Sequence, residues 1–241
     1  MLGWEILDSS PFDKSSLGRN TFLTQQRPLL VNLFTGMLLI GSVLWILPNL
    51  ETKQPTVTPS ETTSITNNIV PLVMKGGDPY LRAFMRTISA SESYDASPYT
   101  ILYGGKHISD LSRHPEICVT IPVGVNKGNC STAAGRYQFI NTTWYERAQQ
   151  YHPNPSGGWF WQKKSYSFEP QYQDAVVYAW LNDSQFWGVD ISQMLQEGKI
   201  HEVLRLLSGT WTSLGYGIET NSMSSSLPSI YKTLLREELD Q

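Results

Sequence analysis

Asp78 to Glu92, with the sequence DPYLRAFMRTISASE, carries the signals of an amphipathic helix that ends in a carboxylate. An aspartate at the N-cap followed by a proline at the first helical position is a well-matched helix start. Apolar side chains then recur at the i, i+3, i+4, i+7 spacing that places them on one helix face; they are Leu81, Phe84, Met85 and Ile88. Glu92 follows Ile88 by four residues, so a carboxylate continues the apolar face.

This position favours Glu92 as a proton donor. Burial beside a core disfavours the charged carboxylate, and the negative end of the helix dipole disfavours it further. A glutamate with the ordinary pKa of ~4.3 is protonated only about 0.2% of the time at pH 7, whereas one raised to ~6 is protonated about a tenth of the time. Periodicity alone leaves a second interpretation open, in which Glu92 lies beyond the helix end in water.

Upstream of this helix, Pro28 to Leu50 contains no charged residue and consists mainly of large apolar side chains. About 20 helical residues cross a hydrocarbon core ~30 Å thick, so this stretch is long enough to span a membrane. It exceeds the ~7 to 15 residues of a signal-peptide core, and no small-x-small cleavage site follows it. We therefore expect an uncleaved transmembrane signal anchor over residues 28–50 rather than a cleaved signal peptide.

The residues around the expected span predict its orientation. More basic residues precede the span than follow it, and basic residues favour the cytoplasmic side; those before it are Lys14, Arg19 and Arg27, and Lys53 comes soon after it. Residues 1–27 are therefore expected to form a short cytoplasmic tail of a single-pass protein in the cytoplasmic membrane. Residues 51–77 are rich in Thr, Ser, Pro and Asn and are expected to tether an extracytoplasmic domain at residues 78–241.

Composition excludes some classes of function. The 241 residues are 40% hydrophobic and 12% aromatic, so most of the chain has the side chains to fold. The formal net charge of -3 gives no basic field for a polyphosphate, and no nucleic-acid partner is expected.

Two cysteines, Cys118 and Cys130, bracket a segment with the pattern of a small β-ribbon. Residues 118–123 alternate in polarity, and glycine and asparagine residues then supply turn chemistry before Cys130. In an extracytoplasmic domain the two cysteines could close this loop as one disulfide, or remain as two free thiols. They lack histidine neighbours, so no metal site is expected.

A series of short sequence blocks begins at Ser91-Glu92 and continues in a fixed order along the chain. They are Ser91-Glu92, Tyr103-Gly104-Gly105, Asp110 with His114-Pro115, STAAGRYQ at Ser131 to Gln138, Gln173 to Val176, Trp211 to Leu214 and Gly215-Tyr216-Gly217. From about Tyr80 to Ile218 this series resembles the lambda-type phage endolysins, which are lytic transglycosylases with a lysozyme-like fold. Two features depart from that pattern: Ser93 replaces a glycine, as in the broader soluble lytic transglycosylases, and the loop containing the cysteines is longer.

The resemblance implies an α+β, lysozyme-like domain that is mostly helical with a small β-hairpin lobe. It also implies that Glu92 is catalytic and that a set of cleft residues binds substrate; these are Tyr103, Ser131, Gly135, Tyr137, Gln138 and Tyr216. Their atoms suit a sugar, since glycine permits close approach, Gln138 offers a donor and an acceptor, and Tyr137 offers a stacking face. A structural alternative, which can hold together with sugar binding, is a helix start capped by Ser131 or Thr132 with Phe139 and Trp144 in the core. For Tyr216 the alternative is an ordinary turn residue.

Three further segments have helical periodicity and are expected to form scaffold, namely residues 170–182, 200–207 and 227–235. The tryptophans Trp159, Trp161 and Trp187 are more often core than sugar-stacking residues in a helical domain.

The expected activity is cleavage of peptidoglycan glycan strands without a cofactor. An ordinary glycosidase needs a second carboxylate ~5.5 Å or ~6.5 to 9.5 Å from the acid, and only Asp95 and Asp110 lie near Glu92 in sequence. The resemblance implies instead that one glutamate acts as acid and then as base, giving a 1,6-anhydro product. The alternatives are a hydrolytic muramidase at the same site and, in a different class, a catalytically silent wall-binding module.

Overall fold

The computed structural model describes residues 66–124, 126–156, 165–216 and 222–241. The expected cytoplasmic tail, the expected membrane span at 28–50, the first part of the tether, and both Trp159 and Trp161 lie outside these ranges. Within the described ranges, no helix is long and apolar enough to cross a membrane.

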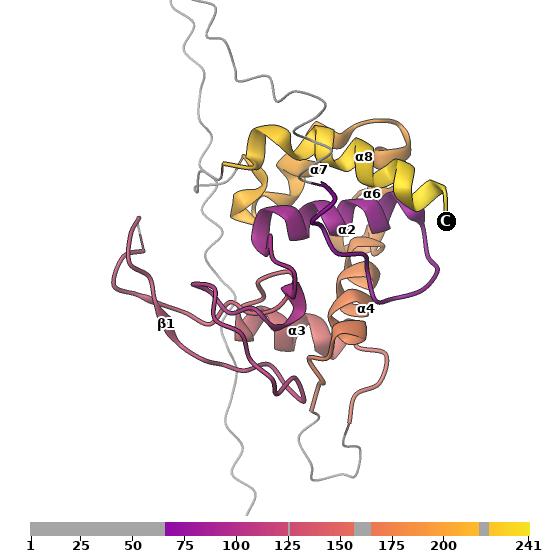
Figure 1. Cartoon of the computed structure of the whole chain (residues 1–241). Helices are drawn as coiled ribbons and strands as arrows, with labels where there is room; N and C mark the ends of the chain where they lie inside the picture. The colour runs from indigo at the N-terminus through magenta and orange to yellow at the C-terminus, as the bar shows by residue number, and fades with distance from the viewer. Residues whose placement is uncertain (1–65, 125, 157–164, 217–221) are drawn as a thin grey trace, which may run out of the picture. The chain divides into compact units, whose positions relative to one another are not determined.

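The described chain is mostly helical, with one small two-stranded sheet (Figure 1). The α-helices are α2 (Pro79–Glu92), α3 (Asn141–Tyr151), α4 (Pro170–Leu181), α5 (Ser184–Trp187), α6 (Ile191–Gln196), α7 (Ile200–Leu207) and α8 (Leu227–Leu239). Short 3-10 helices are η1 (Pro98–Thr100), η2 (Thr212–Leu214) and η3 (Ser224–Ser226), and the strands are β1 (Val119–Thr120) and β2 (Cys130–Ser131). The predicted helices at 170–182, 200–207 and 227–235 and the predicted hairpin are confirmed.

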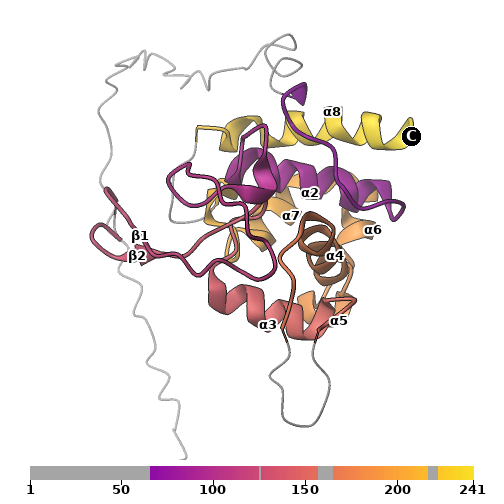
Figure 2. The same ribbon diagram turned by 60° about the horizontal axis from the view of Figure 1, so that its bottom comes forward.

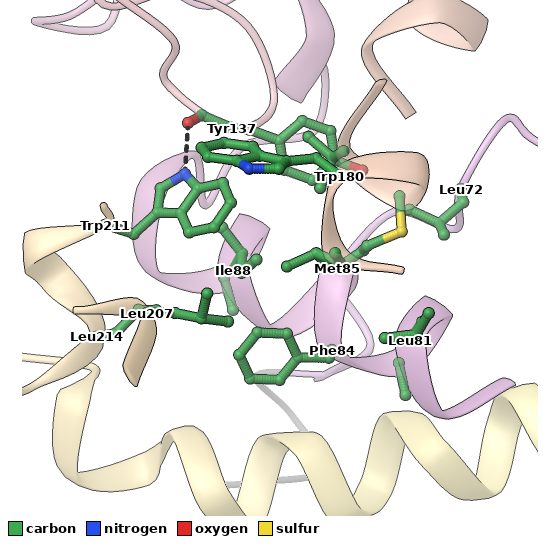
Figure 3. Close-up of a cluster of buried hydrophobic side chains, with 14 of the residues drawn as sticks. Leu72, Leu81, Phe84, Met85, Ile88, Tyr137, Trp180, Leu207, Trp211 and Leu214 are labelled. Atoms are coloured by element: carbon green, nitrogen blue, oxygen red, sulfur yellow. Dashed lines mark hydrogen bonds between the residues drawn. The ribbon is translucent and has the colours of Figure 1, made fainter. Parts of the chain in front are cut away.

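Helix α2 forms the centre of the hydrophobic core. Its start is the predicted one, because the Asp78 carboxylate accepts hydrogen bonds from the amides of Tyr80 (2.7 Å) and Leu81 (3.1 Å). Figure 3 shows Phe84, Met85 and Ile88 directed into a cluster that also contains residues from the chain after α3. All three side chains have 0% exposure, so the helix that ends at Glu92 is held by packing along its length.

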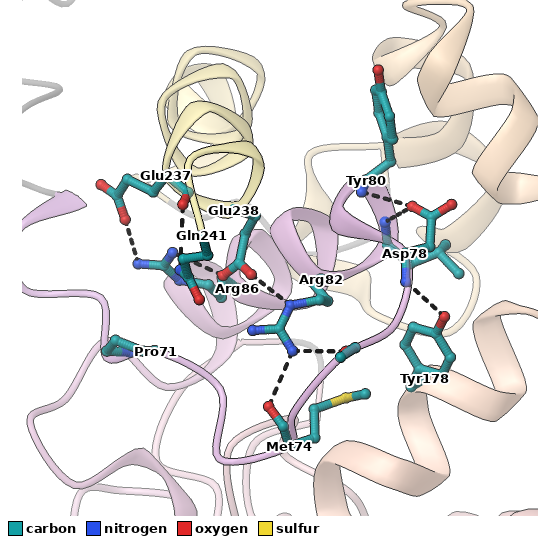
Figure 4. A network of polar contacts seen from close by, with 12 residues as sticks. Pro71, Met74, Asp78, Tyr80, Arg82, Arg86, Tyr178, Glu237, Glu238 and Gln241 are labelled. Carbon is teal, nitrogen blue, oxygen red and sulfur yellow. Dashed lines mark hydrogen bonds and ion pairs between the residues drawn. The ribbon is translucent and has the colours of Figure 1, made fainter.

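The polar side of α2 is also buried, which its single apolar stripe did not predict. Figure 4 shows two arginines of α2 reaching acidic residues at the end of α8. Arg82 pairs with Glu238 at 2.6 Å, and Arg86 pairs with Glu238 at 3.0 Å and Glu237 at 2.7 Å. These ion pairs let charged residues enter the interior, since a buried charge is tolerated when it is paired and hydrogen-bonded.

The residues just before α2 belong to the domain rather than to the tether. Ile69 and Leu72 are each 5% exposed, and we name residues 69–74 the N-terminal strap. Buried side chains bind its backbone: Arg136 donates to the carbonyls of Val70 (2.5 Å) and Pro71 (3.0 Å). The predicted tether extended to residue 77, although its Thr-, Ser-, Pro- and Asn-rich part ends at Asn68. The sequence IVPLVM at 69–74 is apolar enough to be buried.

The hairpin projects from the helical body (Figure 2). Its strands are antiparallel, with Val119 opposite Ser131 and Thr120 opposite Cys130. Cys118 and Cys130 form a disulfide with a Cα–Cα distance of 5.3 Å, so the bridged alternative is confirmed.

The alternative helix start at Ser131 or Thr132 is wrong. Residues 135–138 form a turn instead, closed by a hydrogen bond from the Gln138 amide to the Gly135 carbonyl. Helix α3 begins at Asn141, and Phe139 and Trp144 are core residues as that alternative expected.

The neighbouring glutamates of α8 provide a test of the buried ion pairs. Glu238 has a side chain with 0% exposure and pairs with two arginines, whereas the Glu237 side chain is 41% exposed. Glu238→Gln should lower the free energy of unfolding by about 3 to 5 kcal/mol, because it leaves the buried Arg82 without its counter-charge and Arg86 with Glu237 alone. Glu237→Gln should cost less than about 1 kcal/mol. Denaturant unfolding of both variants measures the difference, and equal losses would contradict this account of the interface.

Candidate active site

A cleft of about 860 Å³ opens at the carboxyl end of α2. Glu92, the last residue of that helix, lines it together with residues from the hairpin, the turn at 135–138 and η2. Four of the predicted substrate-binding residues border this cleft, namely Tyr103, Ser131, Tyr137 and Gln138. The second interpretation of Glu92, as a residue in open water, is wrong because the side chain is half-buried at the cleft wall.

The Glu92 carboxylate is held by a serine from η2. The Ser213 hydroxyl donates a hydrogen bond to Oε1 of Glu92. The Ser213 carbonyl in turn accepts hydrogen bonds from the hydroxyls of Ser91 and Ser224, each at 2.9 Å. Hydrogen bonds therefore run in both directions between α2 and η2, from the Ser91 hydroxyl to the Ser213 carbonyl and from the Ser213 hydroxyl to the Glu92 carboxylate. They fix η2 against the end of α2.

The residue after Glu92 is anchored as firmly. Ser93 is 3% exposed, its amide donates to the Ser89 carbonyl at 2.8 Å, and its hydroxyl donates to the Arg136 carbonyl at 2.6 Å. A glycine at position 93 would lack that hydroxyl. The departure from the lambda-type pattern therefore has a physical role here, because Ser93 ties the helix end to the turn that follows the hairpin.

Gly135 allows close internal packing between its turn and α4. Its φ of +73° lies in the left-handed region, where residues other than glycine are strained. A Cβ at this position would come within 2.3 Å of the Gln173 side-chain oxygen and 2.7 Å of Phe168. That oxygen accepts a hydrogen bond from the Arg136 amide at 2.9 Å. Protein atoms fill the space where a side chain at this position would lie, and Gly135 is not among the residues that line the cleft. Its contact with substrate stays a prediction.

Tyr137 borders the cleft, but its side chain has 0% exposure, so its ring is covered by protein and offers no open stacking face. Its hydroxyl donates to Asp174 at 2.7 Å, and its carbonyl accepts from the indole N–H of Trp211 at 3.1 Å (Figure 3). Burial, the largest cause, and the nearby Asp174 charge raise the pKa of the Tyr137 hydroxyl well above its usual value. The hydroxyl therefore stays protonated and remains a donor to Asp174, beneath the cleft.

The remaining predicted residues occupy different environments. The Gln138 side chain lines the cleft and donates to the Gly135 carbonyl at 2.9 Å, so part of its hydrogen-bonding capacity is used within its own turn. Tyr216 is 42% exposed and is not among the residues that line the cleft. Its ring lies under the Arg205 guanidinium, 5.0 Å away.

Sequence reasoning did not single out Ser213 as a functional residue. It lies in the block Trp211 to Leu214, which carried part of the family resemblance, but it is 121 positions away from Glu92. Periodicity describes one element at a time, so it gives no signal for a contact between distant segments. The one indication in the sequence that Ser213 has a functional role was its place in a block that resembles the endolysin pattern.

Among the described residues, Glu92 is the one carboxylate that lines the cleft. Asp95 accepts from the Ser97 amide at 2.6 Å and faces His107 at 3.6 Å, outside the cleft lining. Asp110 borders a separate hollow, where hydrogen bonds from Ser112 hold its pKa below the usual value. Over these same ranges no cluster of three or more His, Cys, Asp or Glu side chains could hold a metal ion.

Comparison with known proteins gives consistent results. The endolysin family model matches residues 82–235. The endolysin of Escherichia phage lambda is 27% identical over 146 residues, which cover 56% of this chain and 79% of the phage protein. A solved structure of bacteriophage lambda lysozyme complexed with a chitohexasaccharide is 25% identical, covers 67% of this chain and 97% of its own, and has a TM-score of 0.48. A second lambda lysozyme structure is 23% identical, with the same coverages and a TM-score of 0.46.

The resemblance expected from the ordered blocks is therefore confirmed at the level of the family. The match includes α2 with Glu92, the turn at 135–138 and η2 with Ser213, which together build the cleft. Because the family model covers well over half of its length, this chain belongs to the endolysin family.

Proposed function

We propose that this chain cleaves the glycan strands of peptidoglycan, with Glu92 as its catalytic acid. Its place in the endolysin family makes it a lysozyme-like glycosidase. The observation that carries the assignment of Glu92 is its carboxylate, fixed by Ser213 at the wall of a cleft of about 860 Å³. A cleft of this size accommodates several sugar rings and holds the glutamate where a glycosidic oxygen can reach it.

The reaction we propose is a non-hydrolytic transglycosylation. Glu92 donates its proton to the glycosidic oxygen between N-acetylmuramic acid and N-acetylglucosamine as the bond to C1 breaks. The ionised carboxylate then takes the proton of the muramic 6-hydroxyl while that oxygen bonds to C1. The product is a 1,6-anhydro sugar, and Glu92 ends in its starting protonation state without consuming water.

Ser213 suits a glutamate that works in both protonation states. A serine hydroxyl has one donor hydrogen and two acceptor lone pairs. It can donate to the carboxylate of Glu92 and, after rotation about its C–O bond, accept from the carboxylic acid. One partner can therefore satisfy the acid before proton transfer and the base after it. The absence of a second carboxylate among the cleft residues that the structure describes supports this single-glutamate route.

We also propose that residues 28–50 anchor the enzyme in the cytoplasmic membrane, with the domain on the extracytoplasmic side where peptidoglycan lies. The support is the charge-free apolar stretch and the excess of basic residues before it. With the strap assigned to the domain, the proposed tether ends before residue 69.

The first prediction concerns the products of digestion. Purified sacculi treated with the full chain should release fragments ending in 1,6-anhydro-N-acetylmuramic acid, identified by mass spectrometry. Fragments with reducing ends would instead show a hydrolytic muramidase.

Glu92→Gln should lose about two to four orders of magnitude in rate, because it removes the transferable proton. Unchanged digestion by this variant would contradict the assignment of Glu92, and no digestion by the native chain would indicate a silent binding module. Glu146→Gln is the control, because Glu146 on α3 is exposed and does not line the cleft, and this variant should digest sacculi at the native rate.

The second prediction separates the Ser213 hydroxyl from its carbonyl. Ser213→Ala keeps the carbonyl that binds Ser91 and Ser224, and it removes only the hydroxyl on Glu92. We expect kcat to fall about ten- to a hundred-fold, because the donor to the catalytic carboxylate is lost. Ser224→Ala removes a bond to the same carbonyl without touching Glu92, and should change kcat by less than about two-fold. Equal effects of the two substitutions would show that Ser213 acts only through folding.

A further inference from the structure

The hairpin, residues 118–131, supplies one wall of the cleft. Its cleft-lining residues combine apolar side chains with amide and hydroxyl groups that suit a sugar chain; they are Ile121, Val123, Gly124, Asn126, Asn129, Cys130 and Ser131. The same segment extends away from the helical body (Figure 2). Glycan binding therefore depends on an element that lies outside the core.

The hydrophobic effect contributes little to the shape of the hairpin. None of the described residues from Cys118 to Cys130 is buried, and Val123 near the tip is 72% exposed. Each strand has two residues, extended by hydrogen bonds from the Ile121 amide to Asn129 (2.9 Å) and from the Gly128 amide to Ile121 (2.9 Å). An isolated two-stranded hairpin is at best marginally stable in water.

The two ends of the hairpin, in contrast, are fixed to the domain. Before β1, the Glu116 carboxylate accepts from the Tyr145 hydroxyl at 2.6 Å. After β2, the Ala133 carbonyl accepts from the Tyr103 amide at 2.8 Å. Between these anchors, the covalent link from Cys118 to Cys130 restrains the segment that forms the wall.

The disulfide is placed where its redox state acts on the site. Cys118 and Cys130 are both exposed, so a thiol reductant in solution has access to them. Cys130 itself lines the cleft, whereas neither cysteine contributes to the hydrophobic core. Opening this bond should alter the binding wall and leave the interior packed.

We propose that the Cys118–Cys130 disulfide is a redox switch for glycan binding. In the oxidised form the bond holds the hairpin as a wall of the cleft. A dithiol reductant donates two electrons and two protons, leaving two cysteine thiols and an oxidised reductant, and the wall then samples many conformations. Glycan loses its binding surface, while Glu92, Ser213 and the core keep their positions. The chain would bind substrate weakly in a reducing compartment and gain affinity when oxidised. This inference rests on the proposed function, since it concerns the same cleft.

A test uses the full Glu92→Gln chain in detergent, which cannot consume its ligand. Isothermal titration calorimetry with solubilised peptidoglycan glycan strands gives the Kd of the oxidised and the reduced protein, and thiol titration verifies each state. We expect reduction to weaken binding about ten-fold or more, with the midpoint of thermal unfolding changed by no more than a few degrees. A Cys118→Ser/Cys130→Ser variant should bind like the reduced protein and should not respond to the reductant.

Two outcomes would overturn the switch. One is the same affinity, or the same lack of binding, in the oxidised and reduced states. The other is loss of the cooperative unfolding transition on reduction, which would show that the disulfide supports the core and not the wall alone. Neither outcome depends on catalysis. Failure of the proposed function would be seen separately, as unchanged digestion of sacculi by the Glu92→Gln chain without reductant.

Discussion

The segments around the active site are held together by hydrogen bonds to one carboxylate, that of Asp174. Asp174 lies on α4 and is 0% exposed. It accepts hydrogen bonds from the hydroxyls of Tyr99 (2.8 Å) and Tyr137 (2.7 Å) and from the amides of Val73 (2.8 Å) and Met74 (3.1 Å). A buried ionised group is stable only when its lone pairs are satisfied in this way. Three segments far apart in the chain must therefore converge on one side chain.

The Asp174 network reaches the end of α2, where Glu92 lies, through Arg136. This arginine has 0% exposure; its guanidinium donates to the Tyr99 hydroxyl at 2.9 Å and to the N-terminal strap. Its carbonyl accepts from Ser93, the residue after Glu92. A polar interior thus fixes the helix end, and the strap is part of it although it lies before the segment matched by the family model. Rigid support of this kind allows a half-buried glutamate to keep one position at the cleft.

Local patterns in the sequence predicted the elements well, and contacts between elements poorly. The Asp78-Pro79 start and the apolar spacing that follows it are local signals, so α2 and its terminal glutamate were predicted within a residue. The roles of Gly135 and Tyr137 were assigned from what their atoms can do in a cleft. Their actual roles depend on Gln173 and Asp174, which pack against them from α4. Only the fold reveals which partner occupies the space beside a residue.

The ion pairs between α2 and α8 also have a consequence for the order of events during synthesis. Arg82 and Glu238 are separated by 156 positions, and both are buried when paired. While the ribosome makes the intervening chain, the arginines of α2 have no counter-charge and are better solvated by water than by a closing core. The domain therefore cannot complete its interior until α8 has left the exit tunnel.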